Sequence, residues 1–383
     1  MSERAKAFMV VLLTISVCVA GSELLIRLFL PQDTFGRLLM NRPAMFRESD
    51  VLEFELLPGY KGKYVKEEFD TTITINSKGY RGREFDLSKN GRFRILTIGD
   101  SFTLGIGVED NESYPARMEK ILTNDYHLKD IEIVNAGFAA GFSPDTYYLY
   151  LKERGLKLQP DLILIGFFIG NDLDHGKAFW HKWVETDQEG LPLKIENEGA
   201  SVENNRWVLR KKRLRYQLPV LRDSHFFHLA LTSASGLKRL LTGAAGSSSE
   251  LYNPFIYKVT YEERTNVIVK KVQTLFRAMA RLAAKEAIPL AVIMIPAREQ
   301  VYPDEFGLLN NRELDLQKPQ RILAGFFQRE RIPYLDLLPY LKARSKENLF
   351  YFRDDMHWTV KGHELASEVI VDFLVENNLF KRS

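Results

Sequence analysis

Residues 94–114 read RILTIGDSFTLGIGVEDNESY, and the rest of the chain is organised around this stretch. Residues 95–98 have the apolar, β-branched composition of a buried strand. The strand runs directly into Gly99, Asp100 and Ser101. We expect the Ser101 hydroxyl at the carboxyl end of this strand, where open parallel α/β sheets place their ligand and catalytic sites.

Apolar strands and amphipathic helices then alternate almost to the C-terminus. The run 161–169 is apolar throughout, which is typical of a strand covered on both faces of a parallel sheet. Further strands are predicted at 131–135, 289–295 and 333–337, and helices at 114–122, 143–155, 261–287, 318–330 and 364–376. This alternation predicts an α/β fold with a doubly wound parallel sheet.

Composition limits the classes of function. The chain has 383 residues, 45% of them hydrophobic, which is enough for one large α/β domain with small additions. A formal net charge of +3 gives no reason to expect a nucleic-acid partner. The one cysteine, Cys18, lies in the N-terminal apolar segment, so we expect no disulfide or thiolate metal cluster in the remainder.

Residues 1–30 predict either a membrane anchor or a cleaved secretory signal. The apolar run 7–21 would extend about 22 Å as a helix, short of the roughly 30 Å hydrocarbon core. Continuation to residue 30 supplies the missing length and puts Glu23 and Arg27 four residues apart, able to pair. The basic residues precede the apolar run, so the body of the protein is expected outside the cytoplasm, on a single-pass anchor in the cell membrane or secreted after cleavage.

Two segments depart from the alternating pattern. Residues 31–91 are predicted to be a β-rich lead-in, because they contain a run of threonines and isoleucines that favours a strand. Within it, Arg81 and Arg83 are expected to be solvated surface residues. Residues 92–383 form the main domain, with an insertion at about 173–254 that we interpret as able to cap the functional edge of the sheet.

A serine hydroxyl needs help to act as a nucleophile at neutral pH. A neighbouring imidazole must accept its proton, and an acceptor must fix the imidazole tautomer. Among the seven histidines, His357 alone follows an aspartate by three residues in a loop that opens a helix. Asp354 and His357 would lie on the same side of one turn and could reach Ser101 together. His175, His181, His225 and His228 lack the spacing of metal ligands. We expect neither a metal nor another cofactor.

Four short blocks occur in a characteristic order along the chain. They are Gly99-Asp100-Ser101, then Gly137 and Gly141, then Gly170-Asn171-Asp172, and finally Asp354-Asp355-Met356-His357. With these blocks the chain resembles the SGNH/GDSL hydrolases over roughly residues 92–379, apart from the insertion. The resemblance implies a three-layer α/β/α sandwich with a parallel, flavodoxin-like sheet, preceded here by the N-terminal transmembrane helix.

The resemblance also implies roles for individual residues. Ser101 would be the nucleophile, His357 the general base and Asp354 its orienting carboxylate, with Asp355 as the competing carboxylate. The chemistry also needs hydrogen-bond donors aimed at the oxyanion of the tetrahedral intermediate. By resemblance these are the backbone N–H of Ser101, the N–H of Gly141 and the side-chain amide of Asn171.

The sequence departs from the family pattern in two places. The loop between Asn135 and Gly141 is one residue longer than usual, which leaves Gly137 as an alternative oxyanion donor. The third block has Ile169 where the family usually has glycine. Asp100 and Asp172 are expected to hold loops through hydrogen bonds to backbone N–H groups. His363 is expected to cap the last helix or to face solvent.

Three functions are consistent with these residues. The first is an exported serine esterase that hydrolyses a small acyl ester, such as acetyl, on a carbohydrate or lipid-linked substrate. The alternative is an O-acetyltransferase of cell-surface polysaccharide that uses the same triad, since anchored relatives pass an acyl group to a sugar hydroxyl. The third is a noncatalytic glycan-binding or assembly protein with a vestigial triad.

Overall fold

The computed structural model describes residues 2–32, 34, 43–138, 142–173, 181–196, 200–209, 218–241, 253–308 and 311–380. The chain divides into two compact units. Met1–Arg42 and Lys211–Gly246 form the first unit, and Pro43–Arg210 with Ser247–Ser383 form the second. The predicted insertion is therefore shared between the two units.

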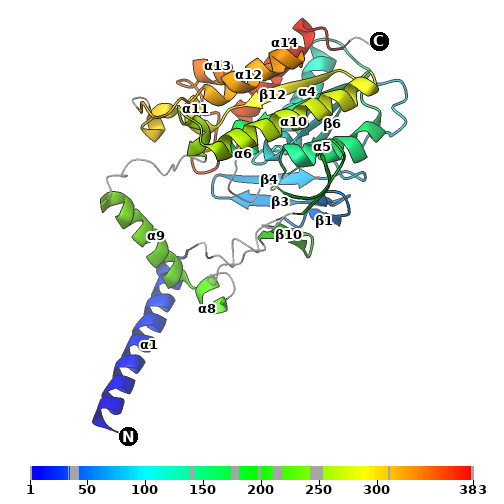
Figure 1. Ribbon diagram of the computed structural model, residues 1–383. Coiled ribbons are helices and arrows are strands. Elements are labelled where there is room, and N and C mark those ends of the chain that lie inside the picture. The colour runs from blue at the N-terminus through cyan, green and yellow to red at the C-terminus, as the bar shows by residue number, and fades with distance from the viewer. Residues whose placement is uncertain are drawn as a thin grey trace. The chain divides into compact units, whose positions relative to one another are not determined.

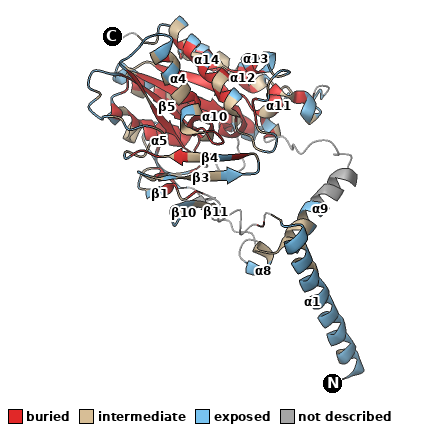
Figure 2. Cartoon of the chain, turned by 180° about the vertical axis from the view of Figure 1, so that it is seen from behind, coloured by how far each residue is buried: buried red, intermediate tan, exposed pale blue. Residues whose placement is uncertain are grey.

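Among its described residues, the first unit contains the helices α1 (Glu3–Phe29), α8 (Pro219–Arg222) and α9 (His225–Leu241). By length and composition α1 could cross a membrane, and its side chains are largely exposed (Figure 2). The expected pair forms, with Arg27 Nη2 3.0 Å from Glu23 Oε1. The Glu23 carboxylate also accepts the backbone N–H groups of His225 and Phe226, which satisfies free donors at the start of α9.

The second unit is built on one parallel sheet. Its strands are β5 (Phe93–Gly99), β6 (Ile131–Gly137), β7 (Leu162–Phe168), β12 (Leu290–Ile295) and β13 (Tyr334–Asp336). They lie in the order β13-β12-β7-β5-β6, and every neighbouring pair is parallel. Figure 1 labels β6 and β12 of this sheet. Counted along the sheet this is the flavodoxin-like order 2-1-3-4-5, whose switch point lies between its first and third strands, here β5 and β7. The predicted fold class is confirmed.

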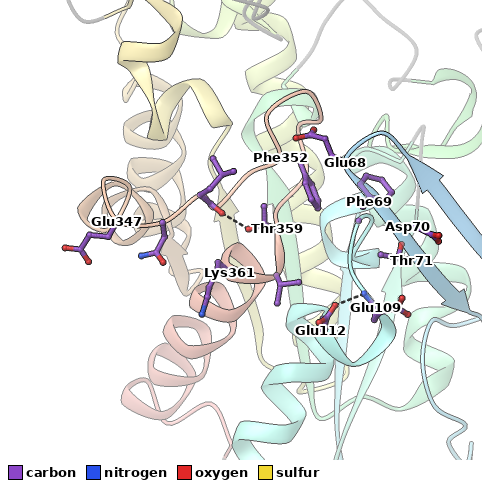
Figure 3. A pocket seen from close by; sticks show the side chains of 14 residues that line it. Glu68, Phe69, Asp70, Thr71, Glu109, Glu112, Glu347, Phe352, Thr359 and Lys361 are labelled. Atoms are coloured by element: carbon purple, nitrogen blue, oxygen red, sulfur yellow. Dashed lines mark hydrogen bonds between the residues drawn. The ribbon is translucent and has the colours of Figure 1, made fainter. Parts of the chain in front are cut away.

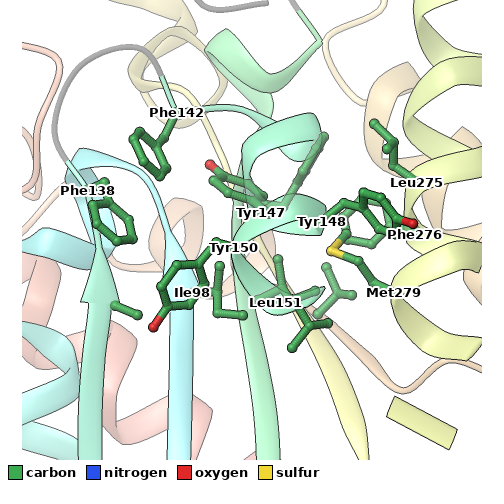
Figure 4. Packing of buried hydrophobic residues seen from close by; sticks show 14 of the residues in the cluster. Ile98, Phe138, Phe142, Tyr147, Tyr148, Tyr150, Leu151, Leu275, Phe276 and Met279 are labelled. Atoms are coloured by element: carbon green, nitrogen blue, oxygen red, sulfur yellow. The ribbon is translucent and has the colours of Figure 1, made fainter. Parts of the chain in front are cut away.

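Helices cover both faces of this sheet, and its strands β7 and β12 are apolar and buried along their whole length. In β7, Leu162 and Leu164 join one buried cluster while Ile163 and Ile165 join the other. The first cluster includes α4 (Tyr114–Asn124), α13 (Leu338–Ala343) and α14 (Val360–Glu376). The second includes α5 (Pro144–Glu153), α10 (Glu263–Lys285) and α12 (Lys318–Glu330). Figure 4 shows Tyr148 of α5 next to Phe276 and Met279 of α10.

The lead-in forms two antiparallel hairpins. β1 (Phe46–Ser49) pairs with β2 (Glu53–Leu56), and β3 (Lys61–Lys66) pairs with β4 (Phe69–Thr74). The expectation of a solvated Arg81 is wrong, since only 4% of this residue is exposed. Its guanidinium donates to the carbonyl oxygens of Leu104, Gly105 and Val108 and pairs with Asp110 at 2.8 Å. Arg83 does lie at the surface, paired with Glu119.

The described part of the insertion in this unit consists of two further hairpins. β8 (Lys182–Thr186) pairs with β9 (Pro192–Glu196), and β10 (Ala200–Glu203) pairs with β11 (Arg206–Leu209). The first hairpin is fixed to α5 through the buried Asp145, which accepts the His181 N–H and the Trp183 Nε1–H, each at 3.2 Å. This packing explains why the outer side of α5 is buried as well as the side that faces the sheet.

Candidate active site

Ser101 lies where the sequence predicts it, directly after β5. It is the first residue of the short helix α3 (Ser101–Leu104), and the carboxylate of Asp100 accepts the Phe102 N–H at 2.9 Å to close the turn. This is the predicted contact of Asp100 with a backbone N–H group. The turn holds the Ser101 side chain at the carboxyl edge of the sheet, next to the switch point between β5 and β7.

His357 meets Ser101 across 256 residues of sequence. Its Nε2 atom lies 2.7 Å from the Ser101 Oγ, a hydrogen-bonding distance for removal of the hydroxyl proton. The imidazole packs against the buried ring of Phe102, with the ring centroids 5.3 Å apart. The predicted approach of these two residues is thus present in the structure, and it is made by the loop that precedes α14.

Asp355, rather than Asp354, lies against the imidazole. Asp355 Oδ1 contacts His357 Nδ1 and also accepts the His357 backbone N–H at 2.9 Å. This local turn places the carboxylate beside the ring. Asp354 is exposed, and its backbone N–H donates to Glu68 at 2.8 Å. The expected Asp354–His357 contact is therefore corrected, since the loop turns the Asp354 side chain away.

The second oxygen of Asp355 is also occupied. Lys66 Nζ, at the end of β3, lies 2.6 Å from Asp355 Oδ2. Burial acts to raise the pKa of Asp355, but the charges of His357 and Lys66 prevail and hold that pKa far below its usual value. Asp355 is therefore ionised throughout the physiological pH range and can stabilise a protonated imidazole.

Asn171 follows β7, the strand that pairs with β5 in the sheet. It belongs to the short helix α6 (Ile169–Asp172), which begins directly after β7. Its Nδ2 atom donates to Asp100 Oδ2 at 2.9 Å, and its Oδ1 atom is buried with no hydrogen-bond partner among the described residues. Asp100 therefore orients the amide that the sequence assigns to the oxyanion hole.

Gly141 and Gly137 are the two glycine candidates for the oxyanion hole. Gly141 lies outside the described residues. Gly137 ends β6, and its N–H donates to the side chain of Asn135 at 2.9 Å. A Cβ at position 137 would overlap Leu104 N and lie 2.5 Å from the Thr103 carbonyl carbon, so the glycine lets α3 approach β6 closely.

Two buried carboxyl groups surround Asn171. Burial raises the pKa of Asp100 to about 6, although its hydrogen bonds and the nearby His357 oppose the rise. Burial, reinforced by the charge of Asp100, raises the pKa of Asp172 well above its usual value. Asp172 accepts the Phe168 N–H, as predicted, and the Tyr147 hydroxyl at 3.2 Å. Asp172 therefore stabilises the start of α6 through hydrogen bonds to β7 and α5.

His363 does not face solvent. It is fully buried, and its Nδ1 accepts the Tyr114 N–H at 3.2 Å, which ties the first turn of α14 to the start of α4. The expectation for His363 is therefore wrong, because the packing of α14 on α4 covers it.

An open groove of about 540 Å³ runs beside residues 352–359, the loop that carries Asp355 and His357 and is called here the catalytic loop of the candidate site. It is lined on one side by residues 68–71 of the β3–β4 hairpin and on the other by Phe352 and Thr359–Lys361, while Ser101 and His357 are not part of its lining. Figure 3 shows Glu68, on the hairpin turn, next to the loop that carries Phe352. Five lining carboxylates against one lysine make it acidic: Glu68, Asp70, Glu109, Glu112 and Glu347.

Sequence reasoning missed three residues that contact the active-site loops. Arg81 holds the segment after Ser101, and Lys66 and Glu68 hold the segment before His357. These residues lie in the lead-in, far from the recognised blocks. A charged residue next to a predicted turn is usually solvated, so the local sequence does not indicate that it will contact a distant loop.

Residues 255–382 match a protein-family model described as "SGNH hydrolase-like domain, acetyltransferase AlgX". The matched segment contains β12, β13, α14 and the loop of Asp355 and His357. Over these residues, the match confirms the predicted resemblance to SGNH hydrolases. No curated protein sequence matches the chain.

Solved structures also show similarity. A mutant of an acetyl-xylooligosaccharide esterase from a Geobacillus species is 15% identical and covers 77% of this chain and 99% of its own, with a TM-score of 0.41. A lipase/acylhydrolase from Enterococcus faecalis is 12% identical and covers 74% of this chain and 96% of its own, with a TM-score of 0.39.

Proposed function

We propose that the protein is an SGNH hydrolase-like enzyme and that it acts as an O-acetyltransferase of polysaccharide. The observation that carries this proposal is the match of residues 255–382 to an acetyltransferase model. The contacts from Ser101 through His357 to Asp355 supply the chemistry. The esterase that the sequence put first uses the same residues with water as the acceptor, so the match favours the alternative.

In the first step Ser101 would accept the acyl group. Its Oγ attacks the acyl carbon of the donor ester while His357 Nε2 takes the hydroxyl proton. Asp355 stabilises the resulting imidazolium through Nδ1. When the tetrahedral intermediate collapses, the donor C–O bond breaks and the donor alcohol leaves with the proton from His357. The product is an acetyl ester on Ser101.

In the second step a glycan hydroxyl would replace the donor alcohol. His357, again neutral, takes the proton of that hydroxyl as its oxygen attacks the acetyl carbon of the acyl-enzyme. Collapse returns the proton to Ser101 Oγ and releases the acetylated glycan. If water enters instead, the same steps release acetate, so the outcome depends on which acceptor reaches the acyl-enzyme.

The oxyanion in both steps would be stabilised by the Ser101 N–H and the Asn171 amide. Asn171 Nδ2 carries two hydrogens, and the bond to Asp100 uses one of them. The other is left for the substrate oxygen. Loss of one oxyanion donor typically costs about 10² to 10³ in kcat.

We also propose that α1 keeps the enzyme at the membrane, with the second unit outside the cytoplasm. A helix of 27 residues extends about 40 Å, enough to cross a hydrocarbon core of about 30 Å. The contacts of Glu23 with the start of α9 support retention of the helix. The intact mass of the purified protein tests this, because cleavage before residue 21 would remove the first 20 residues.

The acyl-transfer proposal is tested with two glycans of different mass. The full-length protein, in detergent, is incubated with an acetylated donor glycan and an unacetylated acceptor, and both are followed by mass spectrometry. We expect acetyl to appear on the acceptor with wild type and with Ser88→Ala, a surface control, but not with Ser101→Ala. Release of acetate alone would make the protein an esterase.

A fluorophosphonate probe separates these enzymes from a binding protein. It should label wild type and not Ser101→Ala. A folded wild-type protein that takes neither label nor acetyl would instead have a vestigial triad.

A further inference from the structure

The β3–β4 hairpin contacts the catalytic loop at two places, the Asp355 side chain and the backbone just before it. Lys66 pairs with Asp355 at 2.6 Å, and Glu68 binds the backbone that leads into it. We propose that Lys66 and Glu68 are positioning residues that hold Asp355 and His357 in the geometry that activates Ser101. This inference rests on the proposed function, because it assigns the two residues to the same acyl-transfer site.

Glu68 binds the loop through three successive amides. Its Oε1 accepts the Arg353 N–H at 2.7 Å, and its Oε2 accepts the N–H groups of Asp354 and Asp355 at 2.8 and 2.9 Å. Successive backbone N–H groups that converge in this way form an anion-binding concavity, here filled by the protein's own carboxylate. Such charge-assisted bonds are stronger than neutral ones, so Glu68 sets the backbone path just before Asp355.

Apolar packing places the hairpin on the loop. Phe69, the residue after Glu68, is buried and its ring packs at a tilt against Phe352, with ring centroids 5.2 Å apart. The Phe352 N–H donates to the carbonyl oxygen of His357 at 3.0 Å, which closes the loop on itself. The ring contact therefore fixes the base of the loop, and Glu68 fixes its tip.

Lys66 acts on the charge of the Asp355–His357 pair. Both oxygens of Asp355 have cationic or potentially cationic partners, Lys66 on Oδ2 and His357 on Oδ1. The positive charge of Lys66 therefore offsets part of the Asp355 charge, which would otherwise stabilise the protonated imidazole more strongly. Two further titratable groups interact with the imidazole, Asp100 at the end of β5 and His363 on α14. Removal of Lys66 leaves both in place.

The first experiment measures kcat/KM for p-nitrophenyl acetate against pH in the full-length protein. In Lys66→Met the imidazolium gains stability, so the acid limb moves to higher pH by about 0.5 to 1 unit, a modest effect because the Lys66 side chain is 42% exposed. Lys66→Arg should restore the wild-type limb. The matched control is Lys63→Met on the same strand, which pairs with Asp70 of β4 at 2.8 Å.

The second experiment tests the hydrogen bonds of Glu68 to the loop through kcat and amide exchange. We expect Glu68→Gln to lower kcat about tenfold or more with little change in KM, because misplacement of the base affects the chemical step. Amide exchange followed by mass spectrometry should show about tenfold faster exchange in peptides covering residues 353–355. Glu67→Gln, an exposed neighbour in the same turn, should change neither quantity.

The outcomes separate this inference from the proposed function. If wild type shows no turnover and no fluorophosphonate label, the proposed function fails, while the exchange experiment still tests the contact of Glu68 with the loop. If wild type is active but Lys66→Met keeps the wild-type acid limb, the role of Lys66 is overturned. If Glu68→Gln leaves both kcat and exchange unchanged, the role of Glu68 is overturned.

Discussion

His357 Nδ1 contacts the carboxylate of Asp355, which stands only two residues earlier in the chain. Asp354, three residues earlier, is exposed. Asp355→Asn should therefore lower kcat by about 10⁴-fold, because an amide at this place favours the wrong imidazole tautomer. Asp354→Asn is the matched control and should change kcat by less than about threefold. Steady-state kinetics on both variants checks this, and equal losses would contradict the assignment of Asp355.

The free energy of unfolding should decrease as the pH rises and Asp100 loses its proton. Its pKa is raised in the folded chain from 3.8 to about 6, so the folded state keeps a proton that the unfolded chain gives up. Stability from this group is complete below about pH 3.8 and is lost as the pH rises through about 6. The total corresponds to about 3 kcal/mol. Denaturant unfolding of Asp100→Asn should show a smaller decline between pH 4 and 7 than wild type or Asp125→Asn, an exposed control.

The same Asp100→Asn variant should lose activity. Two amide groups would then face each other at 100 and 171, and the Asn171 side chain can restore the hydrogen bond by turning its unpartnered Oδ1 toward position 100. That rotation removes Nδ2 from the oxyanion. We expect a loss of about 10²-fold in kcat with an unchanged fold by circular dichroism. Full activity would show that Asn171 does not serve as a donor.

His363 should destabilise the protein in mild acid. Burial lowers its pKa well below 6.5, and the positive charges of Arg81, His357 and Arg117 add to the effect. The unfolded chain takes up a proton as the pH falls through about 6.5, whereas the folded chain does not until much lower. Stability should therefore fall below pH 6.5 by up to about 1.4 kcal/mol per pH unit from this group.

His363→Gln should reduce that slope, because a glutamine oxygen can still accept the Tyr114 N–H without titrating. His127→Gln, at an exposed turn, is the control and should keep the wild-type slope. Denaturant unfolding at pH 5.0, 5.75, 6.5 and 7.25 measures both. A wild-type slope in His363→Gln would mean that another group controls acid sensitivity.

Gly137→Ala should destabilise the fold and displace the nucleophile. The new Cβ would overlap Leu104 N and lie 2.7 Å from Leu104 Cα, and backbone atoms cannot move aside without shifting α3. Overpacking of this kind costs about 1 to 3 kcal/mol or more. Gly325→Ala, in α12 with its nearest neighbour 3.4 Å away at Arg329, should be tolerated or slightly stabilising. Thermal melts and kcat of the two variants check the contrast.

Local patterns determined most of the fold. Continuous apolar runs such as 162–168 predict strands buried on both faces, and 3.6-residue periodicity predicts helices such as Glu263–Lys285. These signals lie within one element, so no long-range information is needed to read them. The two hairpins of the insertion were not foreseen, because their strands are short and largely exposed.

The sequence by itself determined the α/β sheet, the apolar N-terminal helix, and the choice of Ser101, His357 and Asn171 as candidates. Only the tertiary structure showed that Asp355, and not Asp354, contacts His357. It also showed that Arg81 and His363 are buried. Finally, it placed Lys66 and Glu68 against the loop. The physical reason is distance along the chain. Asp355 meets Lys66 across 289 residues of sequence, and contacts of that separation depend on how the whole chain packs rather than on any local pattern.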